Sequence, residues 1–375
     1  MRIVRSRRKN GPGDCGSYAY GFVSQPIPHA SSSIRTAAYK PGLAWFAALG
    51  SAWVFVLVTL GAFTTSIGAG MAFPDWPLSN GSLNPAGWLS DLAMFAEHSH
   101  RLSAGLMSAI TITLAVWLWR TEKRRWLRWL AIAAVALVFV QAVVGGLRVL
   151  LENHQVAMIG TSVGRLFAML HACLAQIFVC TLAAIAAACS RSWIESNAPS
   201  DSDRTGRNRQ LGRLCCALLL AQLAIAAVMR HSFAGLAIPS FPLSTPDGDW
   251  LPRLWDFRVA IHFAHRIMAL IITVAVVWFV VTLLRDRGVS STLKTAAASL
   301  IGLLTLQIYL GASVVWSGRN PELTTAHVIV GASTLATAFL ITWVLHRDAI
   351  EVRSAQVTAN SSRQSLPQTS AFSRA

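Results

Sequence analysis

Charged side chains are scarce in this chain of 375 residues. Asp, Glu, Lys and Arg make up 13% of it and hydrophobic residues 54%, whereas a soluble domain usually carries about 25% charged residues. That shortage excludes an ordinary water-soluble domain and favours a polytopic membrane protein. The formal net charge is +16, but no soluble domain is present whose basic face could bind nucleic acid. We therefore predict the lipid bilayer as a partner and no nucleic acid.

Cysteine is also sparse, and its placement excludes two kinds of chemistry. The six cysteines lie in or near apolar segments, except for one in the N-terminal tail: Cys15, Cys173, Cys180, Cys189, Cys215 and Cys216. None lies in a segment predicted to face an oxidising compartment, so no disulfide is expected. The sequence has no CxxCH pattern, which argues against covalent attachment of a c-type haem.

Long apolar runs, by contrast, are abundant. A transmembrane helix needs about 20 mostly apolar residues, and eight segments qualify, at about 43–64, 97–119, 126–148, 165–189, 212–231, 259–284, 294–316 and 323–345. Polar stretches divide the chain into a basic N-terminal tail (1–42), a first four-helix bundle (43–190), a polar linker (191–211), a second four-helix bundle (212–346) and a disordered C-terminal tail (347–375). We predict an all-α integral membrane protein with eight transmembrane helices.

Basic residues are missing from one side of the predicted membrane protein. Residues 65–96 contain no Lys or Arg, whereas the linker, both tails and the segments after the second and sixth spans are basic. By the positive-inside rule, both termini and the linker lie on the cytoplasmic or matrix side. The N-terminal tail lacks the apolar core of a cleaved secretory signal. A bacterial plasma membrane is favoured, with the mitochondrial inner membrane as the alternative.

The two halves of the chain repeat one another. Residues 70–79 (GMAFPDWPLS) follow the first span and residues 235–244 (GLAIPSFPLS) follow the fifth, at an offset of 165 residues. Offsets of 156 to 166 residues also pair His100, Arg101, Gln141, Gly145 and His171 with His265, Arg266, Gln307, Gly311 and His327. The sequence therefore predicts a tandem duplication of a four-helix unit, with both copies in the same orientation.

Four histidines lie at matching places, each a few residues inside an even-numbered span: His100, His171, His265 and His327. Ionisable groups in membrane spans are costly and are candidates for function, and neutral imidazole is the commonest metal ligand. Each bundle supplies one histidine from each of two parallel helices, an arrangement that suits the two faces of a haem. Zinc would require three or four ligands. We predict two haem sites near the outer face, one in each bundle.

One position differs between the halves in a way that predicts different roles. Glu97 lies one helical turn before His100, and the repeat places His262 at the equivalent position. A carboxylate can relay protons or stabilise a cation, so Glu97 is the candidate catalytic residue of the first site. The second site is then a fixed prosthetic group. Arg101 and Arg266 are predicted to pair with haem propionates.

These residues resemble the haem A synthase family, whose members act in cytochrome oxidase assembly. The resemblance covers about 43–345 and is most specific at Glu97-His-Ser-His100-Arg101, which fits the family's Glu-x-x-His-Arg pattern on the second helix. His262-Phe-Ala-His265-Arg266 fits the corresponding second-half pattern, and His171 and His327 fit the remaining ligand positions.

The resemblance implies an oxidoreductase that converts haem O to haem A. A methyl group of haem O becomes a formyl group by successive hydroxylations and loss of water. His265 and His327 would hold a resident haem b, with its iron, while His100 and His171 would hold the substrate haem and Glu97 would be required. Haem O synthase and cytochrome oxidase assembly factors are the implied partners. The electron donor, the oxygen source and a homo-oligomeric state stay open.

Two other functions compete with this interpretation, and one departure from the family limits it. A non-catalytic di-haem membrane cytochrome usually carries haems across the bilayer, which four histidines near one face disfavour. A haem carrier would also need a haem pocket. Some family members carry a cysteine pair in the first outer loop, but residues 65–96 contain no cysteine. A mechanism that needs a redox thiol pair there is in doubt for this chain.

Overall fold

The computed structural model describes residues 37–157, 160–195 and 203–351. In this part of the chain eight helices are long and apolar enough to cross a membrane, which confirms the predicted spans. They are α1 (Pro41–Ser66), α2 (Leu92–Thr121), α3 (Arg125–Leu150), α4 (Val163–Cys189), α6 (Asp203–His231), α7 (Phe257–Arg285), α8 (Ser291–Trp316) and α9 (Pro321–Leu345). The short helix α5 (Arg191–Glu195) and an antiparallel pair of two-residue strands, β1 (Gln155–Val156) and β2 (Thr161–Ser162), complete the described elements.

Polar residues fix where the helices begin. The side chains of Asp91, Ser162, Asp256, Ser290 and Asn320 precede α2, α4, α7, α8 and α9, and each accepts a hydrogen bond from the backbone N–H three residues further on. Such caps satisfy N–H groups that the first turn of a helix leaves without a partner. Between the caps, the backbone N–H and C=O groups of each helix hydrogen-bond to one another, as an apolar bilayer requires.

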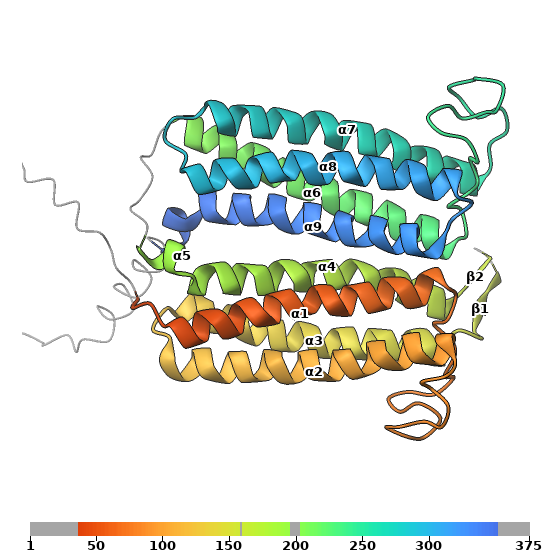
Figure 1. Cartoon of the computed structure of the whole chain (residues 1–375), viewed down its shortest axis with the longest axis horizontal. Coiled ribbons are helices and arrows are strands. Elements are labelled where there is room, and N and C mark those ends of the chain that lie inside the picture. The colour runs from red at the N-terminus through yellow and green to blue at the C-terminus, as the bar shows by residue number, and fades with distance from the viewer. Residues whose placement is uncertain (1–36, 158–159, 196–202, 352–375) are drawn as a thin grey trace, which may run out of the picture. The chain divides into compact units, whose positions relative to one another are not determined.

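The helices form two sets of four (Figure 1). Within the first set α1 packs on α2 and α4, and α3 packs on α2 and α4. The same contacts recur in the second set, where α6, α7, α8 and α9 take the places of α1, α2, α3 and α4. The sets meet where α9 packs on α1 and α4, and where α4 packs on α6. This repetition of contacts follows the repeat in the sequence.

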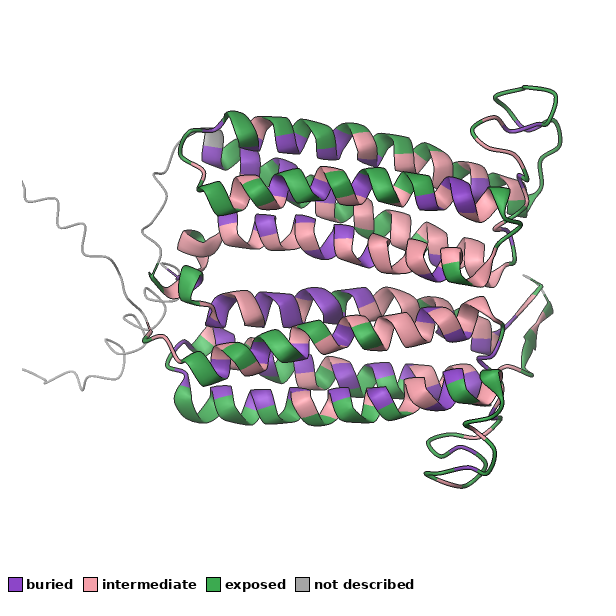
Figure 2. Ribbon diagram, viewed as in Figure 1, coloured by how far each residue is buried: buried purple, intermediate pink, exposed green. Residues whose placement is uncertain are grey.

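Burial follows from this arrangement. The most apolar windows of α4 and α9, the helices between the two sets, are 56% and 44% buried, whereas those of the other spans are 22% to 33% buried. The outer helices keep apolar side chains exposed, for example Leu270, Val274 and Trp278 along one face of α7. Figure 2 shows these exposed faces in green. Apolar faces of this kind suit contact with lipid.

The two ends of the helix sets differ. One end, which we call the loop end, carries the α1–α2 and α6–α7 loops, residues 67–91 and 232–256, and the β1–β2 pair (Figure 1). The other, which we call the linker end, carries α5. The helices α2, α4, α7 and α9 all begin at the loop end, so a residue a few positions into any of them lies near that end.

Two predicted segment boundaries were wrong. The polar linker predicted over 191–211 contains α5, and α6 already begins at Asp203, because its polar first turns extend the helix beyond the apolar span. The C-terminal tail predicted over 347–375 begins with a helical stretch that reaches residue 351. Glu351 is buried because it packs into a polar network at the linker end. Residues 1–36 and 352–375 of the two predicted tails lie outside the described residues.

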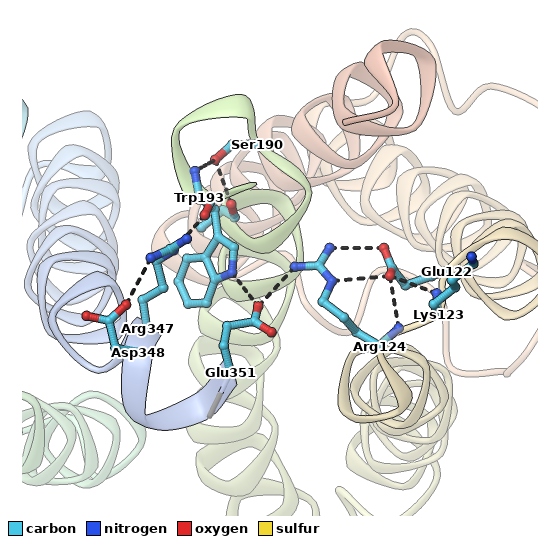
Figure 3. A network of polar contacts seen from close by, with 9 residues as sticks. Glu122, Lys123, Arg124, Ser190, Trp193, Arg347, Asp348 and Glu351 are labelled. Atoms are coloured by element: carbon cyan, nitrogen blue, oxygen red, sulfur yellow. Dashed lines mark hydrogen bonds and ion pairs between the residues drawn. The ribbon is translucent and has the colours of Figure 1, made fainter. Parts of the chain in front are cut away.

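That network joins the two helix sets at the linker end (Figure 3). The Arg124 guanidinium, between α2 and α3, pairs with Glu122 at 2.9 Å and with Glu351 at 3.2 Å. Trp193 of α5 donates its indole N–H to the same Glu351 oxygen at 2.8 Å, and Arg347 donates to the Trp193 carbonyl oxygen at 2.6 Å. Residues that follow α9 are thereby fastened to the first set.

Replacement of Glu351 by alanine is expected to lower the stability of the protein. Removing one partner of a buried ion pair costs about 3 kcal/mol, and the midpoint of thermal unfolding in detergent measures the loss. Glu195→Ala is the control, because its pair with Arg191 is exposed and exposed pairs contribute little. Equal midpoints for Glu351→Ala and the unmodified chain would contradict the prediction.

The network also predicts a direction for the effect of pH. Burial disfavours the ionised Glu122 carboxyl, but hydrogen bonds from Arg124 outweigh burial and hold the pKa of Glu122 below its ordinary value of 4.5. A lowered carboxyl pKa contributes stability that is fully present above 4.5 and is lost as the pH falls through the folded-state value. The stability contributed by the Glu122–Arg124 pair should therefore stay constant near neutral pH and be lost only in more acidic solution, as the midpoint of thermal unfolding measured against pH would show.

Candidate functional site

The four histidines form two pairs, one in each helix set. His100 of α2 and His171 of α4 interact electrostatically, as do His265 of α7 and His327 of α9. Each lies about two turns inside the start of its helix, roughly 9–12 Å along the axis from the loop end. Each pair therefore combines one histidine from each of two helices that run in the same direction within one set.

The ring nitrogens of the four histidines suit a metal that binds one histidine from each of two helices. The Nδ1 atoms of His100, His171, His265 and His327 are buried and have no hydrogen-bond partner among the described residues. Buried polar atoms without partners are costly and call for an explanation. No group of three or more His, Cys, Asp or Glu side chains in the described part of the chain could hold a metal ion. Two axial imidazoles on a haem iron fit this donor set, and a tetrahedral zinc site does not.

Glycines face three of the four rings. A Cβ at Gly61 would lie 2.8 Å from His100 Cε1, and a Cβ at Gly145 or Gly311 would lie 3.1 Å from Cε1 of His171 or His327. Side chains at these positions would crowd the imidazoles. Gly145 and Gly311 are repeat partners, so the space beside the α4 and α9 histidines is preserved in both halves.

Gly311→Ala is accordingly expected to weaken haem binding at the second pair. Overpacking of this kind costs about 1–3 kcal/mol, which corresponds to a roughly fivefold to hundredfold loss of affinity. The haem content of purified protein measures the effect. Gly302→Ala is the matched control on the same helix, because a Cβ there meets nothing within 4 Å. Equal haem content in the two variants would show that the ring of His327 does not need this space.

Glutamines surround the second pair more closely than the first. The Gln222 side-chain nitrogen lies 3.4 Å from His265 Nε2, and that of Gln307 lies 3.3 Å from His327 Nε2. In the first set Gln141 donates to the His171 backbone oxygen at 3.2 Å, and Leu57 occupies the position equivalent to Gln222. Gln222 was not predicted as a site residue; its signal in the sequence is a polar residue within an apolar span.

Arg101 and Arg266 fasten the loops to the helices that carry the first histidine of each pair. Arg101 donates to Phe73, Asp75 and Leu78 oxygens at 3.2, 2.7 and 2.5 Å. Arg266 donates to Ile238, Ser240 and Leu243 oxygens at 3.1, 2.6 and 3.3 Å. The predicted pairing with propionates stays a prediction, and most of the N–H groups of Arg101 already have protein acceptors.

Glu97 and His262 occupy the same structural position. Glu97 is buried, pairs with Arg101 at 2.5 Å and accepts a hydrogen bond from the Phe73 backbone N–H at 3.1 Å. His262 accepts the equivalent bond from the Ile238 N–H at 3.3 Å. Both side chains therefore anchor a loop. The carboxylate brings a negative charge to the first site that the second site lacks.

Further contacts hold the first loop in place. His98 contacts Ser79 Oγ at 2.9 Å and the Leu83 oxygen at 3.2 Å through its two ring nitrogens. Slight burial opposes ionisation of Asp75, but hydrogen bonds from the Gly81 and Asn80 N–H groups hold its pKa below the ordinary value. These contacts give the first loop a defined fold at the loop end of the first set.

Eight spans, a repeated contact pattern and two half-buried histidine pairs define an integral membrane protein with two candidate haem sites. The family model of the COX15-CtaA cytochrome oxidase assembly proteins matches residues 44–339. The chain therefore belongs to this family, the haem A synthase family.

Curated relatives agree with the family assignment. The chain is 26% identical over 315 residues to the "Heme A synthase" of Halalkalibacterium halodurans, covering 81% of this chain and 97% of that protein. It is 26% identical over 279 residues to the "Heme A synthase" of Bacillus licheniformis, covering 74% and 86%. It is 25% identical over 312 residues to that of Alkalihalophilus pseudofirmus, covering 80% and 97%.

Proposed function

We propose that this protein is a haem A synthase that oxidises a methyl group of haem O to a formyl group. The conversion is a four-electron oxidation that adds one oxygen atom. Family membership supports the assignment. The observation that carries it is the pair of similar histidine sites that differ at Glu97 and His262, because two haems with identical duties would not require that difference.

The two pairs have different roles in this proposal. His265 and His327 hold a resident haem b, whose iron supplies one-electron redox chemistry when bound. Gln222 and Gln307, beside their Nε2 atoms, restrict the orientation of these rings. His100 and His171 hold the substrate haem O, and the glycines at 61 and 145 leave room beside their rings.

Glu97 supplies the charge that sets the first site apart. Its carboxylate is fixed by Arg101 and by the Phe73 N–H, so it does not reorganise when positive charge develops nearby. A preorganised negative group of this kind stabilises a developing cation or accepts a proton. His262 accepts only the corresponding backbone bond and brings no carboxylate to the resident site.

The setting of the reaction follows from the distribution of charge. The linker end is basic in sequence and the first loop has no Lys or Arg. We assign the linker end to the cytoplasm of a bacterial plasma membrane and the histidine pairs to the outer half of the bilayer. Haem O synthase is the supplier of the substrate and cytochrome oxidase assembly factors receive the product in this assignment.

Expression of the chain together with a source of haem O tests the proposal. Chromatography of extracted haems should show haem A or its hydroxylated precursor. Unchanged haem O, accompanied by intact bound haem, would overturn the enzyme assignment and favour a di-haem cytochrome or a haem carrier. The pyridine-haemochrome spectrum of the same preparation counts and identifies the bound porphyrins.

A further inference from the structure

A third arginine, Arg148, lies near the end of α3 and close to the first histidine pair. Arg148 is on α3 three residues beyond Gly145, whose Cβ would touch the His171 ring. It is also seven residues beyond Gln141, which donates to the His171 backbone. Residues three and seven positions apart share a helix face, so Arg148 lies one turn above the imidazole on the side of the loop end. It interacts electrostatically with both His100 and His171.

The guanidinium of Arg148 has donors to spare. A guanidinium carries five N–H groups, and the hydrogen bond shown for Arg148 goes to the Gly70 backbone oxygen. The nearby acids Glu97 and Glu152 pair with Arg101 at 2.5 Å and with Arg165 at 3.2 Å. By contrast, Arg101 directs four N–H groups to the loop and to Glu97. The arginine next to the ligand in sequence is largely engaged, and the one on α3 is available.

A residue of the second helix set also comes close to Arg148. His231, at the end of α6, interacts electrostatically with Arg148, Arg165 and His171. Val314 occupies the position on α8 that corresponds to Arg148, and the arginine that interacts electrostatically with His327 in the second set is Arg230 at the end of α6. An arginine on the third helix is therefore particular to the first half, and a half-buried guanidinium with unused donors favours an anionic ligand.

We infer that Arg148 binds a carboxylate of the porphyrin held by His100 and His171 and so selects a substrate with ionised propionates. The inference rests on the proposed function, which places a porphyrin there. Arginine and carboxylate form charge-assisted hydrogen bonds that fix orientation as well as affinity. Arg148 is thus assigned the recognition of substrate propionate, while Arg101 and Glu97 hold the loop.

Binding of two probes to the purified full-length chain tests this assignment. The probes are iron protoporphyrin IX and its dimethyl ester, which has the same ring but no ionisable carboxylate. The signal is the absorbance change that His171→Ala eliminates. In the unmodified protein we expect the diacid to bind about tenfold to a hundredfold more tightly than the diester. In Arg148→Val, which copies Val314, most of that preference should disappear while the diester affinity stays within about threefold.

Two further variants separate recognition from folding. Arg319→Asn removes an arginine from the loop end beyond α8 and installs the residue found at the equivalent position of the first half, Asn153; it should keep the full preference. Arg148→Lys keeps the charge and should keep part of it. Because the preference is a ratio measured within one variant, partial misfolding does not alter it, and the haem content of the second pair reports the folded fraction.

The possible results test the proposed substrate site and the assignment of Arg148 separately. An unmodified protein with no binding that depends on His171 would overturn the proposed substrate site. Binding with an undiminished diacid preference in Arg148→Val would overturn the assignment of Arg148 and leave the proposed function standing.

Discussion

His265→Ala and His327→Ala should each abolish the low-spin haem spectrum of the purified protein. The half-buried imidazoles of His265 on α7 and His327 on α9 interact electrostatically in the second set, and a haem iron that both would hold would lose one protein ligand when either is removed. The glutamines beside these rings cannot replace an imidazole on iron. The expected effect is complete loss of the six-coordinate spectrum, and absorption spectra with haem extraction measure it.

His346→Ala provides the control for these variants. His346 follows α9 at the linker end, where its Nδ1 lies 2.8 Å from the Thr342 oxygen, and its replacement should leave the spectrum unchanged. His171→Ala should also keep the resident haem, because its effect is confined to the first pair. A low-spin spectrum that survives His265→Ala would place the resident haem elsewhere.

Glu97→Ala should reduce product formation by at least about a hundredfold, the usual lower range for loss of a positioned acid or base, while haem stays bound. The variant removes the carboxylate from the first site and also deprives Arg101 of its ion pair and the Phe73 N–H of its acceptor. Loss of activity alone therefore does not separate chemistry from loop anchoring. Extracted haems after expression with a haem O source give the measurement.

The repeat supplies the variant that makes the separation. Glu97→His installs the residue that anchors the second loop through the Ile238 N–H, and Arg101 would retain three loop oxygens, as Arg266 does. If the carboxylate performs chemistry, Glu97→His should be as inactive as Glu97→Ala and should restore the thermal stability that the alanine variant loses. Activity recovered in Glu97→His would assign Glu97 to anchoring alone, and full activity in Glu97→Ala would refute both roles.

Much of the fold was predictable because the bilayer leaves few choices. Runs of about 20 apolar residues must cross as helices, and all eight predicted spans are present. The errors fall where the membrane no longer constrains the chain. Polar turns extend α6 back to Asp203. The helical stretch up to Glu351 is held by the ion pair of the Glu351 carboxylate with Arg124 and by its hydrogen bond from Trp193. No local pattern reports partners 158 or 227 residues away.

The candidate site divides in the same way. The repeat alone matched the four histidines and distinguished Glu97 from His262, because identity at a constant offset survives in the sequence. The sequence alone did not reveal that Arg101 and Glu97 are engaged with the first loop. In the sequence Arg148 is only one of several basic residues near an outer span end, so its place beside His171 could not be told from that of the others.

The amino-acid sequence by itself determined a membrane protein of eight spans, its internal repeat and the identity of the paired histidines. Hydropathy depends only on residues that are neighbours in the chain, and a duplication leaves similar segments at a nearly constant offset. Tertiary structure decided which donors are occupied and which are available, because hydrogen bonds between a loop and a helix depend on how distant segments pack. That is why the unused donors of Arg148 and the network around Glu351 were found only in the tertiary structure.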